Sequence, residues 1–235
     1  AEVGVTEGFG DITDNYSSVS PSNSHVVSSL GGKVVVVYPD NGNSTYGTAV
    51  VGTISGKSVS FGTPVVFENS ATNTVVLVEI TSTNKIAIFY KSDNRYAIVG
   101  TVSGSSISFG SKTTISAEGV SNLTGWYDPI SDRIAVFYRT THVYAEIYSV
   151  SGTSITKVST ATVNSQGDYS DNVNSIYDTN SNQFVTFYMW RSGSNFYTRY
   201  KIGTISGNSI SFGAETDFGT YRFGAPLRAA DTDTR

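Results

Sequence analysis

The sequence predicts an all-β protein built from a repeated unit of about 48 residues, on three observations. A turn that ends in Ser-Gly occurs four times, and successive copies begin 48, 48 and 55 residues apart. Each turn follows a short β-branched and aromatic run that ends in tyrosine, and polar turn residues are abundant along the whole chain. The four turns are Ile54-Ser55-Gly56, Val102-Ser103-Gly104, Val150-Ser151-Gly152 and Ile205-Ser206-Gly207.

The residues around each turn predict four strands per unit. The runs 34–38, 86–90, 134–138 and 184–188 are apolar on both faces, as expected for strands packed between two other sheets. Their terminal tyrosines recur in register, so we expect them to belong to the scaffold. After the turn, three copies alternate polar and apolar residues and end in Ser-Phe-Gly, whereas the third reads Ser154-Ile155-Thr156-Lys157. Four antiparallel strands in a unit of this length predict one blade of a β-propeller.

The two ends of the chain predict a closing blade. The sequence Ala-Glu-Val-Gly at 1–4 resembles Ala-Ile-Val-Gly at 97–100, and residues 230–235 resemble the turn after Tyr127. We therefore expect one propeller domain over residues 1–235 with five blades. A four-bladed ring, with residues 1–13 as an extra strand, is the alternative. The blades are expected at about 20–67, 72–116, 120–163 and 170–218, with a closing blade formed by 1–13 and 219–235.

Charge and composition exclude several classes of function. The net charge is -4 at pH 7 and the pI is about 5.1, so there is no electrostatic reason to expect binding to nucleic acid or to an anionic membrane. No apolar run of about 18 residues occurs, so we expect no membrane insertion. The absence of cysteine excludes disulfides and zinc thiolate sites. A weakly charged sequence rich in Ser, Thr and Asn favours an extracellular or virion (particle-surface) location.

The residues offer little for catalysis. His25 and His142 lie in different repeats, and no nucleophile elbow or zinc-binding helix motif is present. A propeller glycosidase would need two carboxylates about 5 to 10 Å apart, and Glu79 is the clearest acidic residue in an inner strand. Asp128 and Asp178 precede Ser- or Asn-rich turns, and capping of those turns explains them better than calcium binding. We expect no enzyme activity, no cofactor and no metal.

The positions that differ most between the copies lie in the loop after each tyrosine-terminated strand. Equivalent loops of a propeller share one edge of the ring, so they would form one surface. They contain a tryptophan, amides and guanidiniums, which are the groups that stack on sugar rings and bind sugar hydroxyls. Trp190 with Arg191 is the expected anchor. The other candidate ligand-binding residues are Asp40, Asn41, Asn43, Asp93, Asn94, Arg95, Arg139, His142 and Asn195.

The segment from Tyr46 to Gly62, Tyr-Gly-Thr-Ala-Val-Val-Gly-Thr-Ile-Ser-Gly-Lys-Ser-Val-Ser-Phe-Gly, resembles a repeat of propeller-like proteins from marine bacteria and their viruses. The resemblance covers nearly the whole chain and rests on turn glycines and core aromatics. In size and repeat length the chain is also similar to five-bladed invertebrate lectins of the tachylectin-2 kind, which bind amino sugars in one pocket per blade. That similarity is one of architecture and carries over no sugar-binding residue.

These observations predict a recognition module that binds a glycan or cell-surface polymer in a lectin-like manner. Because the loops diverge, we expect one or two sites rather than five equal ones. The alternative is a structural or decoration domain of a larger, for example viral, assembly, whose partners would be protein subunits. A propeller glycosidase is the third hypothesis. A groove lined by aromatic and amide groups would favour glycan binding, a large apolar patch on one ring face or along the outer strand would favour assembly, and two close carboxylates in the central well would favour the enzyme.

Overall fold

The computed structural model describes residues 26–30, 32–81, 83–116, 120–165, 173–192 and 195–219. These residues form strands and one short 3₁₀ helix, which confirms the all-β class. Within them, no helix is long and apolar enough to span a membrane. The predicted closing blade falls outside the described residues except for Gly219.

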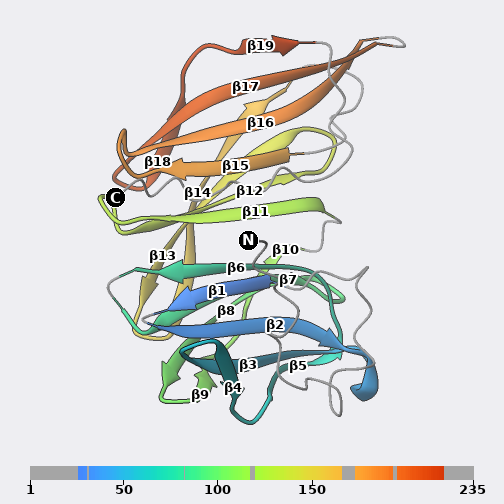
Figure 1. The fold of residues 1–235 in the computed structure, drawn as a ribbon. Helices are drawn as coiled ribbons and strands as arrows, with labels where there is room; N and C mark the ends of the chain where they lie inside the picture. Colours follow the sequence, from blue (N-terminus) through green and yellow to red (C-terminus); the bar gives the residue numbers. More distant parts are fainter. Residues whose placement is uncertain are drawn as a thin grey trace, which may run out of the picture. The chain divides into compact units, whose positions relative to one another are not determined.

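The strands form four antiparallel sheets, and each sheet comes from one repeat (Figure 1). The first consists of β1 (Val26–Leu30), β2 (Lys33–Asp40), β3 (Tyr46–Ser55), β4 (Ser58–Phe61) and β5 (Val65–Ala71). The second consists of β6 (Asn73–Ile80), β7 (Lys85–Lys91), β8 (Arg95–Ser103), β9 (Ser106–Phe109) and β10 (Thr113–Ser116). The third consists of β11 (Ser121–Asp128), β12 (Arg133–Arg139), β13 (Val143–Ser151) and β14 (Ser154–Asn164). The fourth consists of β15 (Val173–Asp178), β16 (Gln183–Ser192), β17 (Asn195–Ser206), β18 (Ser209–Phe212) and β19 (Thr216–Gly219).

The chain divides into two compact units, each with its own core. One unit holds the first two sheets and Ser151–Ile155, and its core includes Val35, Ile88 and Ile98. The other holds the rest of the third sheet and the fourth, and its core includes Phe137 and Phe184. A single domain over residues 1–235 stays a prediction.

The outermost strand of three sheets is split in two. Both β4 and β5 pair with β3, and the same arrangement recurs in the second and fourth sheets. The break follows the Ser-Phe-Gly sequence, where the amide of Gly110 donates to the carbonyl of Val99 at 3.0 Å. Pro64 lies in the first of these breaks, where the chain needs no amide donor. The third copy lacks this glycine, and β14 runs unbroken over 11 residues.

A glycine and a phenylalanine face each other across strands in the same three sheets. Gly100 pairs with Phe109, and a Cβ atom at Gly100 would lie 2.9 Å from the Phe109 ring and 2.8 Å from Ile107. The ring therefore occupies the space above the glycine. In the third sheet Tyr148 stands at the glycine position and Lys157 at the phenylalanine position, so the aromatic side chain comes from the other strand.

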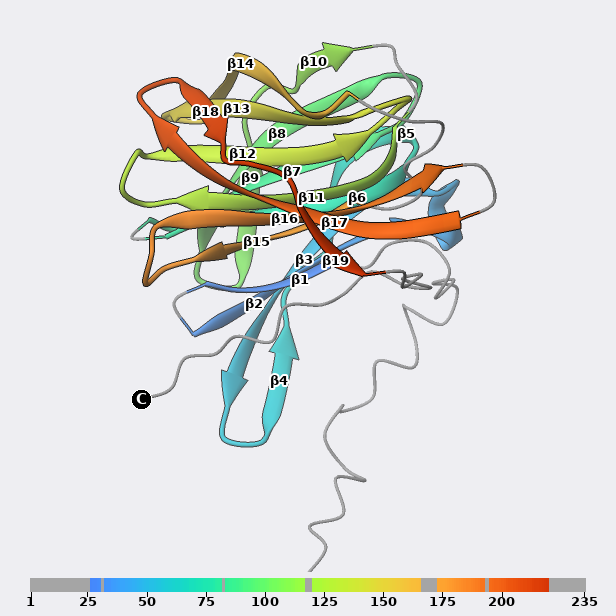
Figure 2. The same ribbon diagram turned by 90° about the horizontal axis from the view of Figure 1, so that it is seen from above.

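Strands of the fourth sheet extend further than the sequence predicted. The sequence predicts a loop at 189–196, and this prediction is wrong because β16 runs to Ser192 and β17 begins at Asn195 (Figure 2). Trp190 pairs with Tyr197 and Arg191 pairs with Phe196. Tyr188 and Met189 are consecutive and each is 1% exposed, so both faces of the strand are covered at this point.

The tyrosine-terminated strands of the sheets differ in how completely they are buried. Residues 86–90 of β7 and 134–138 of β12 are buried without exception, as predicted for strands covered on both faces. Residues 184–188 of β16 instead alternate between buried and half-buried. The fourth sheet therefore has one well-covered face and one that is partly open.

Candidate functional site

The recurring tyrosines carry a hydrogen bond to a carboxylate. In the first unit the hydroxyl of Tyr90 donates to Glu68 at 2.9 Å, and Lys112 binds the same carboxylate at 2.6 Å. Glu68 is almost fully buried, so the lysine offsets a charge that would otherwise be costly. Burial, together with the bond to Glu68, raises the pKa of Tyr90 far above its usual range.

Two further copies build the same arrangement with different residues. In the third sheet Tyr138, Tyr148 and Lys157 all bind the buried carboxylate of Glu146. In the fourth sheet Tyr188 and Arg199 both bind Glu215, and burial followed by the bond to Glu215 raises the pKa of Tyr188. The arrangement repeats although its members change, which agrees with a scaffold role for the tyrosines.

In the first unit, the candidate loop residues lie near one edge of the two sheets. Asp40 caps the helix η1 (Asn41–Asn43) by accepting from the amide of Gly42 at 3.0 Å, and Asn41 and Asn43 are exposed. The neighbouring loop is linked to this edge by Ser92, whose hydroxyl donates to the carbonyl of Ala71 at 2.9 Å.

The second of these loops is ordered by its own side chains. The carboxylate of Asp93 accepts from the hydroxyl of Tyr96 and the amide of Asn94, each at 2.9 Å, and these bonds lower its pKa. Arg95 is only 1% exposed and lies near Ser116, so its side chain belongs to the interior. We therefore leave Arg95 out of the proposed ligand-binding set.

In the second unit, the candidate loop residues have mixed surroundings. Arg139 and His142 are half-buried, and a ring nitrogen of His142 lies 3.1 Å from the hydroxyl of Thr141. Asn195 is exposed at the start of β17, and Arg191 lies in β16. Trp190 is half-buried within the strand and is not in a surface loop.

The middle of the fourth sheet differs chemically from the same position in the other repeats. The cross-strand pair there is Val36 with Val50 in the first sheet and Ile88 with Ile98 in the second. It is Val136 with Glu146 in the third sheet and Thr186 with Lys201 in the fourth. An apolar pair is thus replaced by a hydroxyl and an ammonium group in the fourth repeat. Neither residue is among those predicted from the sequence, because both lie within strands and not in the divergent loops.

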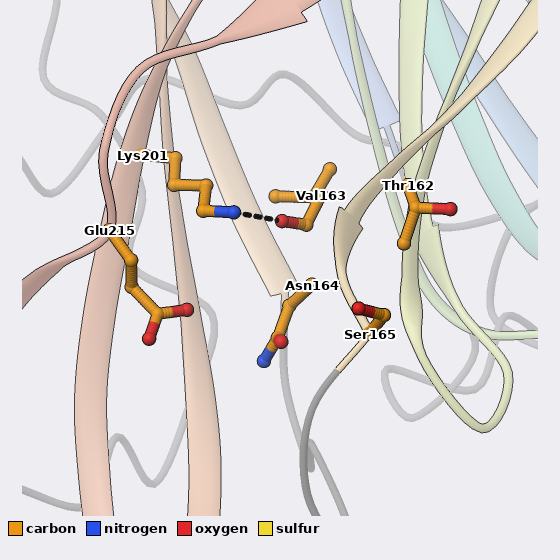
Figure 3. Close-up of a pocket in the computed structure, with 6 residues that line it drawn as sticks. All are labelled: Thr162, Val163, Asn164, Ser165, Lys201 and Glu215. Atoms are coloured by element: carbon orange, nitrogen blue, oxygen red, sulfur yellow. Dashed lines mark hydrogen bonds between the residues drawn. The ribbon is translucent and has the colours of Figure 1, made fainter.

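Lys201 lines a cavity of about 310 Å³ in the second unit (Figure 3). Its ammonium group donates to the carbonyl of Val163 at 2.8 Å, which joins β17 to the end of β14. Figure 3 shows Lys201 and Glu215 on one side of the cavity and the residues of the β14 end on the other. The other lining residues are Thr162, Asn164 and Ser165.

Trp190 is connected to this cavity through Arg199. The guanidinium carbon of Arg199 lies 4.0 Å from the centre of the Trp190 ring, a cation–π contact. Tyr197 also lies against the ring, with the two ring centres 5.2 Å apart. Arg199 binds Glu215, which lines the cavity, and also binds Asp217 at 2.7 Å. Trp190 therefore supports an ion-pair network at the cavity wall.

Two buried polar atoms on this face of β16 have no hydrogen-bond partner within the described part of the chain. They are the hydroxyl oxygen of Thr186, which is 0% exposed, and the indole nitrogen of Trp190. Alternation places both side chains on the face that carries Lys201. Buried polar atoms normally have a partner, so these two mark a place where water or a ligand is expected.

The remaining acidic candidates have structural surroundings. Asp128 accepts from the hydroxyls of Tyr177 and Ser131, at 2.7 and 2.6 Å. Asp178 accepts from the hydroxyl of Ser181 and the amide of Asn180, and these bonds lower its pKa. Both therefore cap the turns they precede. Among the residues that the structure describes, no group of three or more His, Asp or Glu side chains is placed to hold a metal ion.

Comparison with known proteins identifies the fold. No protein-family model matches the chain, and no curated protein is similar to it in sequence. Among solved structures, the chain is similar to the lectin of the fungus Aleuria aurantia, a six-bladed β-propeller described as having a novel fucose recognition mode. The TM-score is 0.50 at 17% sequence identity, over 86% of this chain and 64% of that one. The chain thus spans less than two thirds of the lectin's length, and the similarity supports the predicted propeller repeat fold.

Proposed function

We propose that the chain is a non-enzymatic recognition module that binds glycans in a lectin-like manner, with its main site in the cavity of the second unit. The observation that carries the proposal is the Thr186–Lys201 pair. A position that is apolar core in the first two sheets is polar in the fourth and borders a cavity. In the third sheet the polar residue at this position, Glu146, is bound by Tyr138, Tyr148 and Lys157. Lys201 instead binds the carbonyl of Val163 at the cavity, so the exchange in the fourth sheet points to a role other than packing.

The cavity has the size and the groups that a sugar residue requires. About 310 Å³ lies at the lower end of the range for small-molecule sites. The hydroxyls of Thr162 and Ser165 and the amide of Asn164 can each donate and accept hydrogen bonds, as sugar hydroxyls do. The ammonium group of Lys201 adds donors, and Glu215 adds acceptors held in place by Arg199.

We propose that some of the loop residues predicted from the sequence bind the ligand at this site or form a second, weaker site. Asn195, Arg139 and His142 belong to the same unit as the cavity. Arg191 is also retained as a candidate of this unit. The candidates in the first unit would form a separate surface, and they are Asp40, Asn41, Asn43, Asp93 and Asn94. The low charge of the chain supports an extracellular or particle-surface location for such a module.

We also propose that the propeller has five blades, closed by residues 1–13 and 219–235. The partly open face of the fourth sheet supports this. Phe187, Tyr200 and Ile202 lie on the face opposite Lys201, and Phe218 packs against Phe187 at a ring distance of 5.5 Å. Ile202 is 40% exposed and Phe218 is 53% exposed. An apolar sheet face of this kind needs a partner, and a further blade would supply one.

The same face carries the second candidate function. If protein subunits of an assembly cover Ile202 and Phe218, the chain would be a structural or decoration domain, as an exposed apolar patch indicates. If a closing blade covers this face, polar substitutions on it should destabilise the isolated chain. If separate subunits cover it, the isolated chain should tolerate them.

A glycan-array screen tests the proposed function. The wild-type chain is compared with a Thr162→Val, Asn164→Leu double variant, which removes two polar groups of the cavity with little change in side-chain volume. A Trp190→Ala, Arg191→Ala variant tests the originally expected anchor. Saturable binding that the cavity variant loses supports the proposal. No binding on the array by a folded wild-type chain would contradict it and favour the structural role.

A further inference from the structure

The ammonium group of Lys201 differs from the cations that bind the tyrosine-linked glutamates. Lys112 binds Glu68, Lys157 binds Glu146, and Arg199 binds Glu215 and Asp217. Among the described residues, no carboxylate lies within ion-pair distance of Lys201. Its bond to the carbonyl of Val163 uses one of its three N–H donors, and two donors are left over.

The acidic residue in the same cavity already has binding partners of its own. Tyr188 donates to one carboxylate oxygen of Glu215, and Arg199 binds the other. Arg199 is held in turn by Trp190 and Asp217. Glu215 is therefore fixed in its own network, and among the described residues its ion pair is with Arg199 and not with Lys201. A cation in a partly enclosed polar cavity attracts an anion more strongly than it would in open water.

The rest of the cavity wall is neutral and polar. Thr162, Asn164 and Ser165 offer hydroxyl and amide groups, and Asn164 is almost fully buried. Thr186, whose hydroxyl oxygen has no partner among the described residues, stands directly across the sheet from Lys201. The part of the wall around Lys201, an ammonium group beside hydroxyls and an amide, suits a ligand with a single negative charge and several hydroxyls.

We infer that the cavity takes a sugar residue that carries a carboxylate, such as a hexuronic or sialic acid. The inference rests on the proposed function and gives the substrate class for the same site. The two remaining donors of Lys201 bind the carboxylate, and charge-assisted bonds of this kind are about twice as strong as neutral ones. The side chains of Thr162, Asn164 and Ser165 bind the hydroxyls of the same sugar. Lys201 thereby selects acidic over neutral sugars.

The test compares sugars that differ in charge. The methyl glycosides of glucuronate, galacturonate and N-acetylneuraminate are titrated into the full chain by NMR, alongside the neutral methyl glucoside and galactoside. We expect at least one acid to bind about tenfold more tightly than the neutral sugars. Lys201→Met should remove this preference, and Lys201→Arg should keep part of it. Lys57→Met is the matched control, because it removes the same charge from an exposed turn.

The outcomes separate the inference from the proposed function. If neutral sugars bind as well as the acids, or if Lys201→Met leaves acid binding unchanged, the carboxylate assignment is overturned while glycan binding stands. If no sugar of either class binds and the array is also blank, both fall. Lys201→Met must show an unchanged unfolding midpoint. If it unfolds, Lys201→Gln replaces it, and the same preference is measured.

Discussion

The guanidinium carbon of Arg199 lies 4.0 Å from the centre of the Trp190 ring, and the same guanidinium binds the carboxylate of Glu215 in the cavity wall. The tryptophan that the sequence marked as a sugar-stacking platform therefore has a cation against its ring. Its role in binding would be indirect: it holds Arg199, and Arg199 holds Glu215. In the proposed site Trp190 would thus be a positioning residue, and its contribution should depend on Arg199.

Trp190→Ala should lower the free energy of unfolding by about 1 to 3 kcal/mol and weaken glycan binding by about 1 kcal/mol or more, because Arg199 loses its ring contact. Trp190→Phe should lose less than half of each. Denaturant unfolding and glycan titration measure the two effects. If Trp190 acts through Arg199, the losses in affinity from Trp190→Ala and Arg199→Met will not add in the double variant. Fully additive losses would indicate direct stacking on the sugar.

Alkaline pH should destabilise the protein through its buried phenols. The folded-state pKa values of Tyr90 and Tyr188 are raised by burial and by their glutamates, above the value of about 10 expected for an unfolded chain. Their contribution to stability is therefore complete below about pH 10 and is lost as the pH rises through the folded-state values. Unfolding followed by circular dichroism, with tyrosinate absorbance, should show ionisation and unfolding together.

Tyr90→Phe provides the control for this pH dependence. It should cost about 1 to 3 kcal/mol at pH 7, because the buried Glu68 loses a donor, and it should reduce the loss of stability above pH 10. Tyr46→Phe removes a phenol from a half-buried position of the same unit and should cost less. Ionisation of every tyrosine near pH 10 in a chain that remains folded would contradict this explanation.

Gly100→Ala should destabilise the first unit by about 1 to 3 kcal/mol, because the new Cβ would lie within 2.9 Å of Ile107 and Phe109. Phe109→Leu in the same chain should recover part of the loss by freeing space. Gly104→Ala is a useful comparison, because nothing lies within 4 Å of its Cβ position and its cost would come from its positive φ of 60°. Thermal unfolding measures all three. A neutral Gly100→Ala would show that the ring can move aside.

Ile202→Thr and Phe218→Ser should each destabilise the isolated chain by more than about 1 kcal/mol if a closing blade covers their face. Ile130→Thr is the control, since Ile130 is 73% exposed in a turn and its replacement should change stability by less than about 0.5 kcal/mol. If Ile202→Thr and Phe218→Ser both change the stability as little as Ile130→Thr does, the face is open in the isolated chain. The assembly hypothesis would then gain weight.

Local sequence patterns predicted most of the fold. The Ser-Gly turns fix the hairpins, each with a glycine at a φ of 60°, and the apolar runs fix the central strands. The split of the outer strand was not predicted, because the role of the glycine after Phe61 or Phe109 depends on a bond to a neighbouring strand. The length of β16 and β17 was also missed, because Trp190 and Arg191 stand in a polar, divergent segment that still pairs across the sheet.

The site was harder to predict than the fold. The most divergent positions of the repeats lie in loops, whereas Lys201 lies in the middle of β17 among scaffold residues. The signal was present in the sequence: aligning the copies on their turn glycines places Val50, Ile98, Glu146 and Lys201 at one position. Glu146 is compensated by the nearby Lys157, whereas Lys201 contacts Val163, 38 residues earlier in the chain, and lines the cavity. The sequence does not show which of the two charges faces a cavity, so only the structure distinguishes them.

The most direct test of the central claim is to map the residues whose amide NMR signals shift when a glycan binds. The amide shifts of the ¹⁵N-labelled protein are followed while a glycan selected on the array is titrated. We predict that the perturbed amides cluster at 162–165, 199–201 and 214–216, around the cavity. Perturbation confined to the loops at 40–45 and 91–95, or none at saturating glycan, would contradict a binding site in the fourth repeat.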